Sequence, residues 1–298
     1  MKKHYLIPLF IVMISIMLIS CGGKKVMKTA PSFEPYKFEA SQYEPKVDNF
    51  LVILDTSSSM GDKYGQKEKS KIAKDFLSAM NQTLPELSYN AALMTFGHDA
   101  HLPDKSAMLV YGPAKYSTSG FESALNATKG PSGSSSLPLA KAINASGVDL
   151  KSTQGSTAVI LVSDGEKMDQ TPVKAAEALK SQFGDRLCID TVLVGDNPGG
   201  KMTLEQIARA GGCGISTTAD QLASSANMAG FVEGLFLAKP APKPVPMAAA
   251  PKPMDSDKDG VTDNLDQCPN TPLGATVDAR GCWTYAAKVL FGINSAKV

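Results

Sequence analysis

The sequence predicts an α/β domain with a doubly wound, mostly parallel sheet between residues 48 and 238. Two unbroken apolar runs, Phe50–Leu54 and Ala158–Val162, are each followed within two residues by an aspartate. Strands buried on both faces of a parallel sheet show such runs in place of alternation. Segments with helical periodicity alternate with these runs, which is typical of doubly wound domains.

The elements follow in order along the chain. Ile72, Phe76 and Met80 lie four residues apart and predict a helix over Ser70–Leu84. Thr171 and Pro172 suit the N-cap and first position of another helix, and Thr203 with Gln206 has the spacing of a capping box. The remaining expectations are a strand at 89–96, a hairpin and short helix within 98–130, a helix at 135–145, strands at 188–195 and 214–216, and a last helix at 220–238.

Hard oxygen ligands follow the two apolar runs. Asp55, Ser57 and Ser59 come directly after the first, and Asp164 after the second. The carboxyl ends of parallel strands meet at one sheet edge, and these oxygens suit Mg²⁺ or Mn²⁺. The alternative is that the hydroxyls only cap the next helix. Two strands that each deliver a carboxylate to the same edge favour the cation site.

This pattern resembles the von Willebrand factor A family, whose metal site uses Asp-x-Ser-x-Ser, a threonine on a middle loop and a later Asp-Gly. The resemblance implies that Asp55, Ser57 and Ser59 are ligands and that Asp164 acts last, often through water. At the middle position Leu137 precedes Pro138, so the hydroxyl would come from Ser136 or Ser135. The implied function is non-enzymatic: a bound cation keeps one position open for an acidic protein ligand. The alternative is a metal-poor spacer of the cell envelope.

The N-terminus resembles a bacterial lipoprotein signal. Residues 1–20 begin with lysines and continue as an apolar stretch of secretory length, ending before Cys21-Gly22. The resemblance implies cleavage before Cys21, lipid on its thiol and an outer-membrane address, with residues 21–47 as a tether. The net charge of +1 gives no support for a nucleic-acid partner.

Export predicts that the other four cysteines form disulfides. Proximity favours Cys268 with Cys282, which leaves Cys188 and Cys213 as the second pair.

A proline-rich linker at 239–254 leads to an aspartate-rich segment at 255–282. Its carboxylates at alternate positions around Gly260 suit Ca²⁺, and the segment resembles the thrombospondin type 3-like repeat of OmpA-like outer-membrane proteins. Residues 283–298 resemble the beginning of a truncated OmpA-like domain and lack the Asp and Arg that hold cell-wall peptide, so peptidoglycan binding would need a full C-terminal domain. The expected calcium ligands are Asp255, Asp257, Asp259, Val261, Asp263 and Asp266.

Support for catalysis is weak. Gly195–Lys201 has the spacing of a nucleotide phosphate loop, but Met202 replaces the Ser or Thr that would hold Mg²⁺. The sequence therefore favours a Pro-Gly-Gly turn there, with a nucleotide hydrolase as the less favoured alternative.

Overall fold

The computed structural model describes residues 33–97, 107–132, 139–240 and 252–284. The chain divides into two compact units, Met1–Pro240 and Ala241–Val298. Among the described residues, no helix has the length and apolar character needed to cross a membrane. The signal segment, Cys21, Ser135, Ser136 and most of the expected OmpA-like beginning lie outside the described residues.

The first unit is built on a six-stranded sheet with the order β6-β5-β2-β7-β8-β9. Only the pairing of β5 with the edge strand β6 is antiparallel. The two predicted apolar runs form β2 and β7, which are neighbours and are buried along their whole length. The predicted doubly wound, mostly parallel sheet is therefore confirmed. The strands are β2 (Asn49–Asp55), β5 (Asn90–Phe96), β6 (Ala107–Lys115), β7 (Thr157–Ser163), β8 (Leu187–Leu193) and β9 (Ser216–Thr218).

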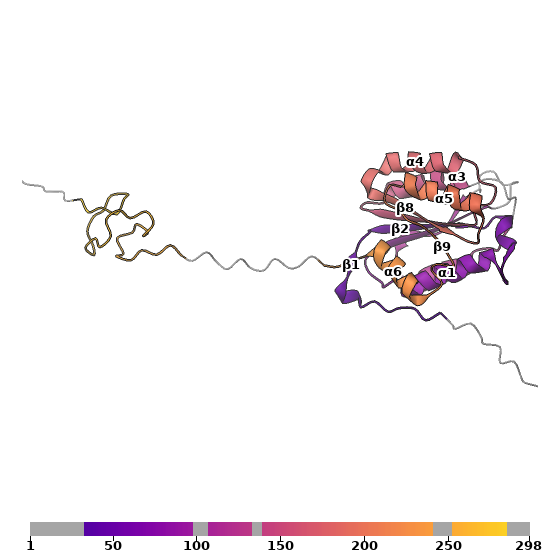
Figure 1. The fold of residues 1–298 in the computed structure, drawn as a ribbon, viewed down its shortest axis with the longest axis horizontal. Helices are drawn as coiled ribbons and strands as arrows, with labels where there is room; N and C mark the ends of the chain where they lie inside the picture. The colour runs from indigo at the N-terminus through magenta and orange to yellow at the C-terminus, as the bar shows by residue number, and fades with distance from the viewer. Residues whose placement is uncertain (1–32, 98–106, 133–138, 241–251, 285–298) are drawn as a thin grey trace, which may run out of the picture. The chain divides into compact units, whose positions relative to one another are not determined.

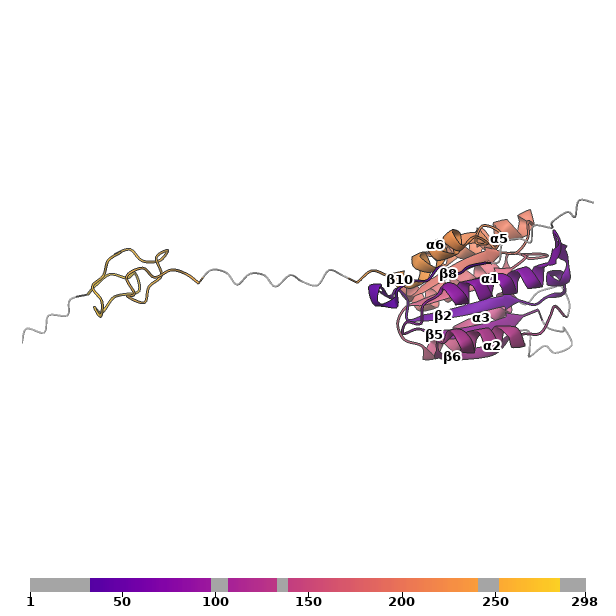
Figure 2. The same cartoon turned by 90° about the horizontal axis from the view of Figure 1, so that it is seen from below.

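Helices cover both faces of this sheet (Figures 1 and 2). Phe50, Val52 and Leu54 face one core, and Leu51 and Ile53 face the other, because alternate side chains of a strand point to opposite faces. The first core contains α1 (Lys69–Thr83), α2 (Thr118–Ala127) and α6 (Ser225–Phe236), and the second contains α3 (Leu139–Asp149), α4 (Thr171–Phe183) and α5 (Pro198–Ala210).

Shorter elements complete the first unit. Strand β1 (Glu44–Pro45) pairs with β10 (Leu237–Ala238), which joins the two ends of the domain. Strands β3 (Lys63–Tyr64) and β4 (Lys67–Glu68) form a hairpin before α1. The 3₁₀ helices are Ala40–Gln42, Ser58–Gly61, Leu150–Ser152 and Gly184–Arg186.

Several predicted boundaries were wrong. Helix α5 begins at Pro198, not near Thr203, because the Asn197 side chain accepts a hydrogen bond from Gly200 N at 2.8 Å and caps the helix there. The predicted Pro-Gly-Gly turn is thus the first turn of a helix. Thr171 is the first residue of α4 instead of its N-cap. The last helix is shorter than predicted, since its N-cap is Ser224.

The second unit is organised by loops and one disulfide. Cys268 and Cys282 are bonded, and an isolated antiparallel bridge pairs Val277 with Trp283. Thr271 is buried and donates a hydrogen bond to the carbonyl oxygen of Gly281 at 2.9 Å. A disulfide supports a small unit of this kind where the apolar core is minimal.

Candidate metal centre

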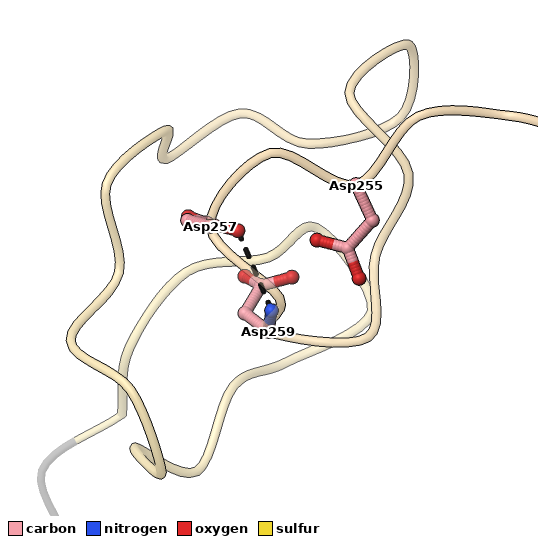
Figure 3. A group of neighbouring side chains, drawn as sticks. All are labelled: Asp255, Asp257 and Asp259. Atoms are coloured by element: carbon pink, nitrogen blue, oxygen red, sulfur yellow. Dashed lines mark hydrogen bonds between the residues drawn. The ribbon is translucent and has the colours of Figure 1, made fainter.

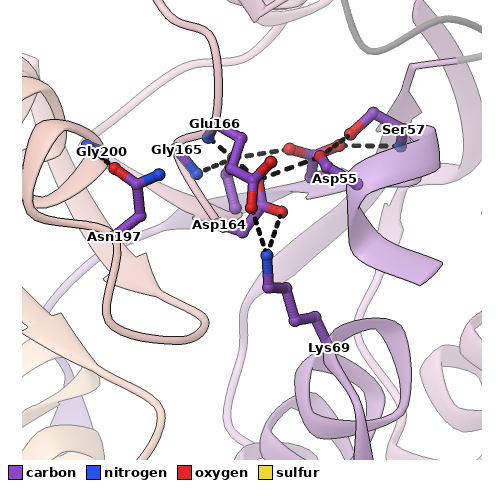
Figure 4. A network of polar contacts seen from close by, with 10 residues as sticks. Asp55, Ser57, Lys69, Asp164, Gly165, Glu166, Asn197 and Gly200 are labelled. Carbon is purple, nitrogen blue, oxygen red and sulfur yellow. Dashed lines mark hydrogen bonds and ion pairs between the residues drawn. The ribbon is translucent and has the colours of Figure 1, made fainter. Parts of the chain in front are cut away.

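The site lies at the carboxyl edge of the sheet, where β2 and β7 end. Asp55 is the last residue of β2, and Asp164 directly follows β7. Leu54 and Val162 are paired in the parallel register, so Asp55 lies level with Ser163 and Asp164 follows one residue later at the same edge. Ser57 lies after β2 beside Asp55 (Figure 4). Ser59 lies in the 3₁₀ helix Ser58–Gly61, and its hydroxyl reaches both Ser57 and Asp164.

Hydrogen bonds join these side chains into one network. Asp55 accepts from Ser57 N at 2.8 Å and from Ser163 Oγ at 2.5 Å through its two oxygens. The hydroxyls of Ser57 and Ser59 lie 3.1 Å apart, and Ser59 Oγ donates to Asp164 Oδ1 at 3.3 Å. The structure therefore brings together four of the five residues expected at the Mg²⁺ site. Ser136 is the fifth, and it lies outside the described residues.

The described residues on either side of Ser136 lie beside this network. Ser132 N donates to the carbonyl oxygen of Thr56 at 3.0 Å, directly after Asp55. Leu139, the next described residue, lines a small cavity together with Asp55 and Ser57. Both Ser132 and Leu139 thus adjoin the first motif.

Burial makes the site favourable for positive charge. The pKa of Asp55 is raised to about 6, first because the side chain is buried; hydrogen bonds from Ser163 and Ser57 oppose the rise and the charge of Asp164 adds to it. A carboxylate that is costly to ionise in isolation gains strongly from a nearby cation. The cavity beside Asp55 has a volume of about 30 Å³, which suits one ion or one water molecule. Oxygen donors, buried charge and a small hollow fit a divalent cation.

Lys69 is a member of the site that the sequence did not predict. It is the first residue of α1, and its side chain is 10% exposed. Its Nζ lies 3.1 Å from Asp164 Oδ2 and 2.6 Å from Glu166 Oε1 (Figure 4). Burial is the largest influence on the pKa of Lys69 and lowers it, but the hydrogen bonds to Glu166 and Asp164 prevail and the pKa is raised. A buried ammonium therefore already compensates Asp164.

Two glycines allow α5 to approach this edge. Gly165 follows Asp164, and its positive φ of 66° belongs to the region that favours glycine. A Cβ on Gly200 would lie 2.7 Å from the Asp164 carbonyl oxygen and 2.7 Å from Gly165 Cα. Gly200, one of the glycines that suggested a phosphate loop, thus has a packing role, and Asn197 fills the cap position of the helix.

The second unit contains a separate acidic cluster. Asp255, Asp257 and Asp259 each offer a carboxylate oxygen within 4.8 Å of the others (Figure 3). Asp259 Oδ2 is buried and has no hydrogen-bond partner in the structure. Because an unpaired buried carboxylate oxygen is costly, this arrangement fits a cation.

Two of the other expected calcium ligands, Asp263 and Asp266, are not members of that group of three. Asp263 accepts from the backbone and hydroxyl of Ser256, both at 2.7 Å, and Asp266 accepts from Cys268 N at 2.8 Å. Val261 adjoins the cluster, because it donates its N–H to Asp259 Oδ1 at 2.8 Å.

The four described cysteines form two disulfides. Cys188 in β8 is bonded to Cys213, which lies between α5 and β9, and Cys268 is bonded to Cys282. The first therefore ties α5 and the edge strand to the sheet.

Parts of this chain are similar to known proteins. Residues 50–166 match the family model described as von Willebrand factor type A domain. An uncharacterised Bacillus subtilis protein, YwmC, is 29% identical over 205 residues, which is 65% of this chain and 86% of that protein. Outer membrane porin F of Pseudomonas aeruginosa is 53% identical over 60 residues; these cover 20% of this chain and only 16% of the porin.

Among solved structures, an aerotolerance-related membrane protein from Bacteroides fragilis is 18% identical, with a TM-score of 0.48 over 63% of this chain and 96% of that one. A von Willebrand factor type A protein from Catenulispora acidiphila is 16% identical, with a TM-score of 0.45 over 63% of this chain and 41% of that one. The segment that matches the von Willebrand factor type A model, residues 50–166, contains strands β2, β5, β6 and β7 of the described sheet.

Proposed function

We propose that this chain is a non-enzymatic, lipid-anchored binding protein of the outer membrane, whose von Willebrand factor A domain holds Mg²⁺ or Mn²⁺ for recognition of an acidic protein ligand. The observation that carries the proposal is the hydrogen-bonded chain from Asp55 through Ser57 and Ser59 to Asp164 at one sheet edge. Two neighbouring strands deliver these groups to one buried place, which helix capping alone does not explain.

The roles of the residues follow from their positions. Asp55, Ser57 and Ser59 would hold the cation. Asp164, which accepts a hydrogen bond from the Ser59 hydroxyl, would contribute a carboxylate from the end of the neighbouring strand. When bound, a cation with few protein charges around it attracts a carboxylate of the partner. The sheet edge and the short 3₁₀ helix keep the donors in place before any partner arrives.

A metal-poor spacer of the cell envelope is the second candidate. One observation favours it: the Lys69 ammonium already neutralises Asp164, as a bound cation would. In that case the domain would bind its partner, if any, without a metal.

We also propose that Asp255, Asp257 and Asp259 hold Ca²⁺ in the second unit. The buried, unpaired oxygen of Asp259 supports this assignment. Ca²⁺ accepts several carboxylate oxygens with flexible geometry, so a loop cluster of this kind suits it. The lipid anchor at Cys21 rests on the sequence pattern alone.

Isothermal calorimetry on the full chain in detergent tests both sites. Mg²⁺ and Mn²⁺ heats should disappear in Asp55→Asn and persist in Asp259→Asn, and the Ca²⁺ heat should show the reverse. Asp75→Asn, an exposed acid of α1 that pairs with Lys67, is the matched control and should change neither. A Mg²⁺ binding heat that remains in the Asp55→Asn variant would contradict the proposal. If the wild type gives no metal-binding heat, the spacer is favoured, and if it binds ATP, the hydrolase alternative is favoured.

A further inference from the structure

We infer that Lys69 is a built-in competitor for the cation site: its ammonium holds Asp164 when no metal is bound and must leave Asp164 when a divalent cation binds. This inference rests on the function proposed above. It assigns to Lys69 a role in setting cation affinity, and it makes cation binding move a side chain at the start of α1.

The position of Lys69 is unfavourable for ordinary helix reasons. A positive charge at the first residue of a helix opposes the helix dipole, and the first turn of α1 contains no acidic residue to compensate it. The compensation comes from the segment directly after β7, through Asp164 and Glu166. The ion pair is therefore specific to the cation site.

Asp164 has little capacity left for a metal while Lys69 is present. Its Oδ1 accepts from Ser59 Oγ at 3.3 Å and from Glu166 N at 3.1 Å, and its Oδ2 faces Lys69 Nζ at 3.1 Å. A divalent cation at Asp164 would meet a like charge at hydrogen-bond distance from the same carboxylate. In a buried site such repulsion is strong, so the two cations exclude each other.

Glu166 gives Lys69 a place to go. Its side chain is 26% exposed, whereas that of Asp164 is 2% exposed. Lys69 can therefore leave Asp164, keep its 2.6 Å contact with Glu166 and turn toward solvent. Gly195 leaves space beside the lysine stem, because even an added Cβ there would lie 3.6 Å from Lys69 Cε.

The first test measures Mn²⁺ affinity of the full chain in detergent by the electron paramagnetic resonance signal of free Mn²⁺. The Mn²⁺ that the Asp55→Asn variant still binds is subtracted from the Mn²⁺ bound by each protein. This subtraction removes any contribution of the second unit. Lys69→Met keeps the length of the side chain without its charge and should bind Mn²⁺ roughly tenfold or more tightly than the wild type.

Two variants are matched controls. Lys69→Arg keeps the charge and should stay close to the wild-type affinity. Lys67→Met removes the same charge from an exposed lysine nearby, whose partner is Asp75, and should also leave the affinity unchanged.

The second test uses the wild type and therefore does not depend on the folding of a variant. The rate of acetylation of Lys69 by an amine-reactive ester, followed by peptide mass spectrometry, should rise severalfold on addition of Mg²⁺. Lys67 is the internal reference, because its side chain is 59% exposed.

The inference is overturned if Lys69→Met binds Mn²⁺ no more tightly than the wild type, or if Mg²⁺ leaves the rate of Lys69 acetylation unchanged or lowers it. Either result leaves the proposed function standing. Absence of Mn²⁺ binding in both the wild type and Lys69→Met overturns the proposed function together with it.

Discussion

Asp190 provides the sharpest test of the electrostatics inside the sheet. It lies in β8 and is 1% exposed; Oδ1 accepts from Ile215 N at 2.8 Å, and Oδ2 is buried without a hydrogen-bond partner in the structure. Its pKa is raised to about 6, first by burial, while the hydrogen bond from Ile215 and the charge of Lys46 oppose the rise. The native state therefore holds this proton more tightly than the unfolded chain does.

The sign of the stability change follows from linkage. Protonated Asp190 contributes to the free energy of unfolding. This contribution is fully present below the pKa of 3.8 that Asp190 has in the unfolded chain, and it is lost as the pH rises through about 6. A shift from 3.8 to about 6 corresponds to roughly 3 kcal/mol at about 1.4 kcal/mol per pKa unit. Asp190→Asn removes the titration and keeps an acceptor for Ile215. We expect the free energy of unfolding of the variant to exceed that of the wild type by about 1–3 kcal/mol at pH 8 and to equal it near pH 4.

Urea unfolding followed by circular dichroism at pH 4 to 8, with chelator present to remove cations, measures this difference. Asp185→Asn makes the same chemical change at an exposed position and is the matched control. A stability difference between Asp190→Asn and the wild type that stays constant across this pH range would refute the reasoning.

Three further predictions concern packing and covalent support. Gly200→Ala should lower the free energy of unfolding by about 1–3 kcal/mol and weaken Mg²⁺ binding, because its Cβ would meet the backbone of Asp164 and Gly165 at 2.7 Å. Gly199→Ala is the control: its Cβ would have no neighbour nearer than 3.4 Å, so its effect should be smaller in the same unfolding and calorimetry experiments. Replacing both Cys188 and Cys213 by serine should lower stability by about 2–4 kcal/mol in urea, and unchanged stability would contradict a structural role for this bond. Phe50→Ala should cost about 3–5 kcal/mol in the same assay, because Phe50 is buried among Tyr89, Tyr116, Phe121 and Phe236.

The apolar runs predicted β2 and β7 correctly for a physical reason. Each strand lies in the interior of the sheet with helices on both faces, so every position along it is buried and alternation disappears. Adjacent parallel strands end at the same edge, so the meeting of Asp55 and Asp164 could also be predicted. These features depend on short stretches of sequence and on one rule of sheet geometry.

Other features depend on choices that local sequence leaves open. Asn197 and Thr203 both suit a helix cap; Asn197 caps α5, while Thr203 is buried inside it and donates back to the Gly199 carbonyl oxygen at 3.1 Å. Strand β6 is mostly half-buried or exposed at the edge of the sheet, so its pattern is weak. Lys69 could not be predicted as a site residue, because it is the first residue of a helix and no rule of sheet geometry places that position beside Asp164 and Glu166.

The charge of the site would limit how the proposed acidic partner is recognised. Asp55, Asp164, Glu166 and Lys69 leave two negative charges when all four are ionised. A divalent cation brings that total to zero, so the occupied site has little long-range field to steer an acidic protein toward it. Recognition would then depend on direct contact of a carboxylate with the cation and on the shape of the surrounding edge. The rate of association should therefore respond weakly to ionic strength. The bond between the partner's carboxylate and the cation is electrostatic, but it acts at distances shorter than those that salt screens.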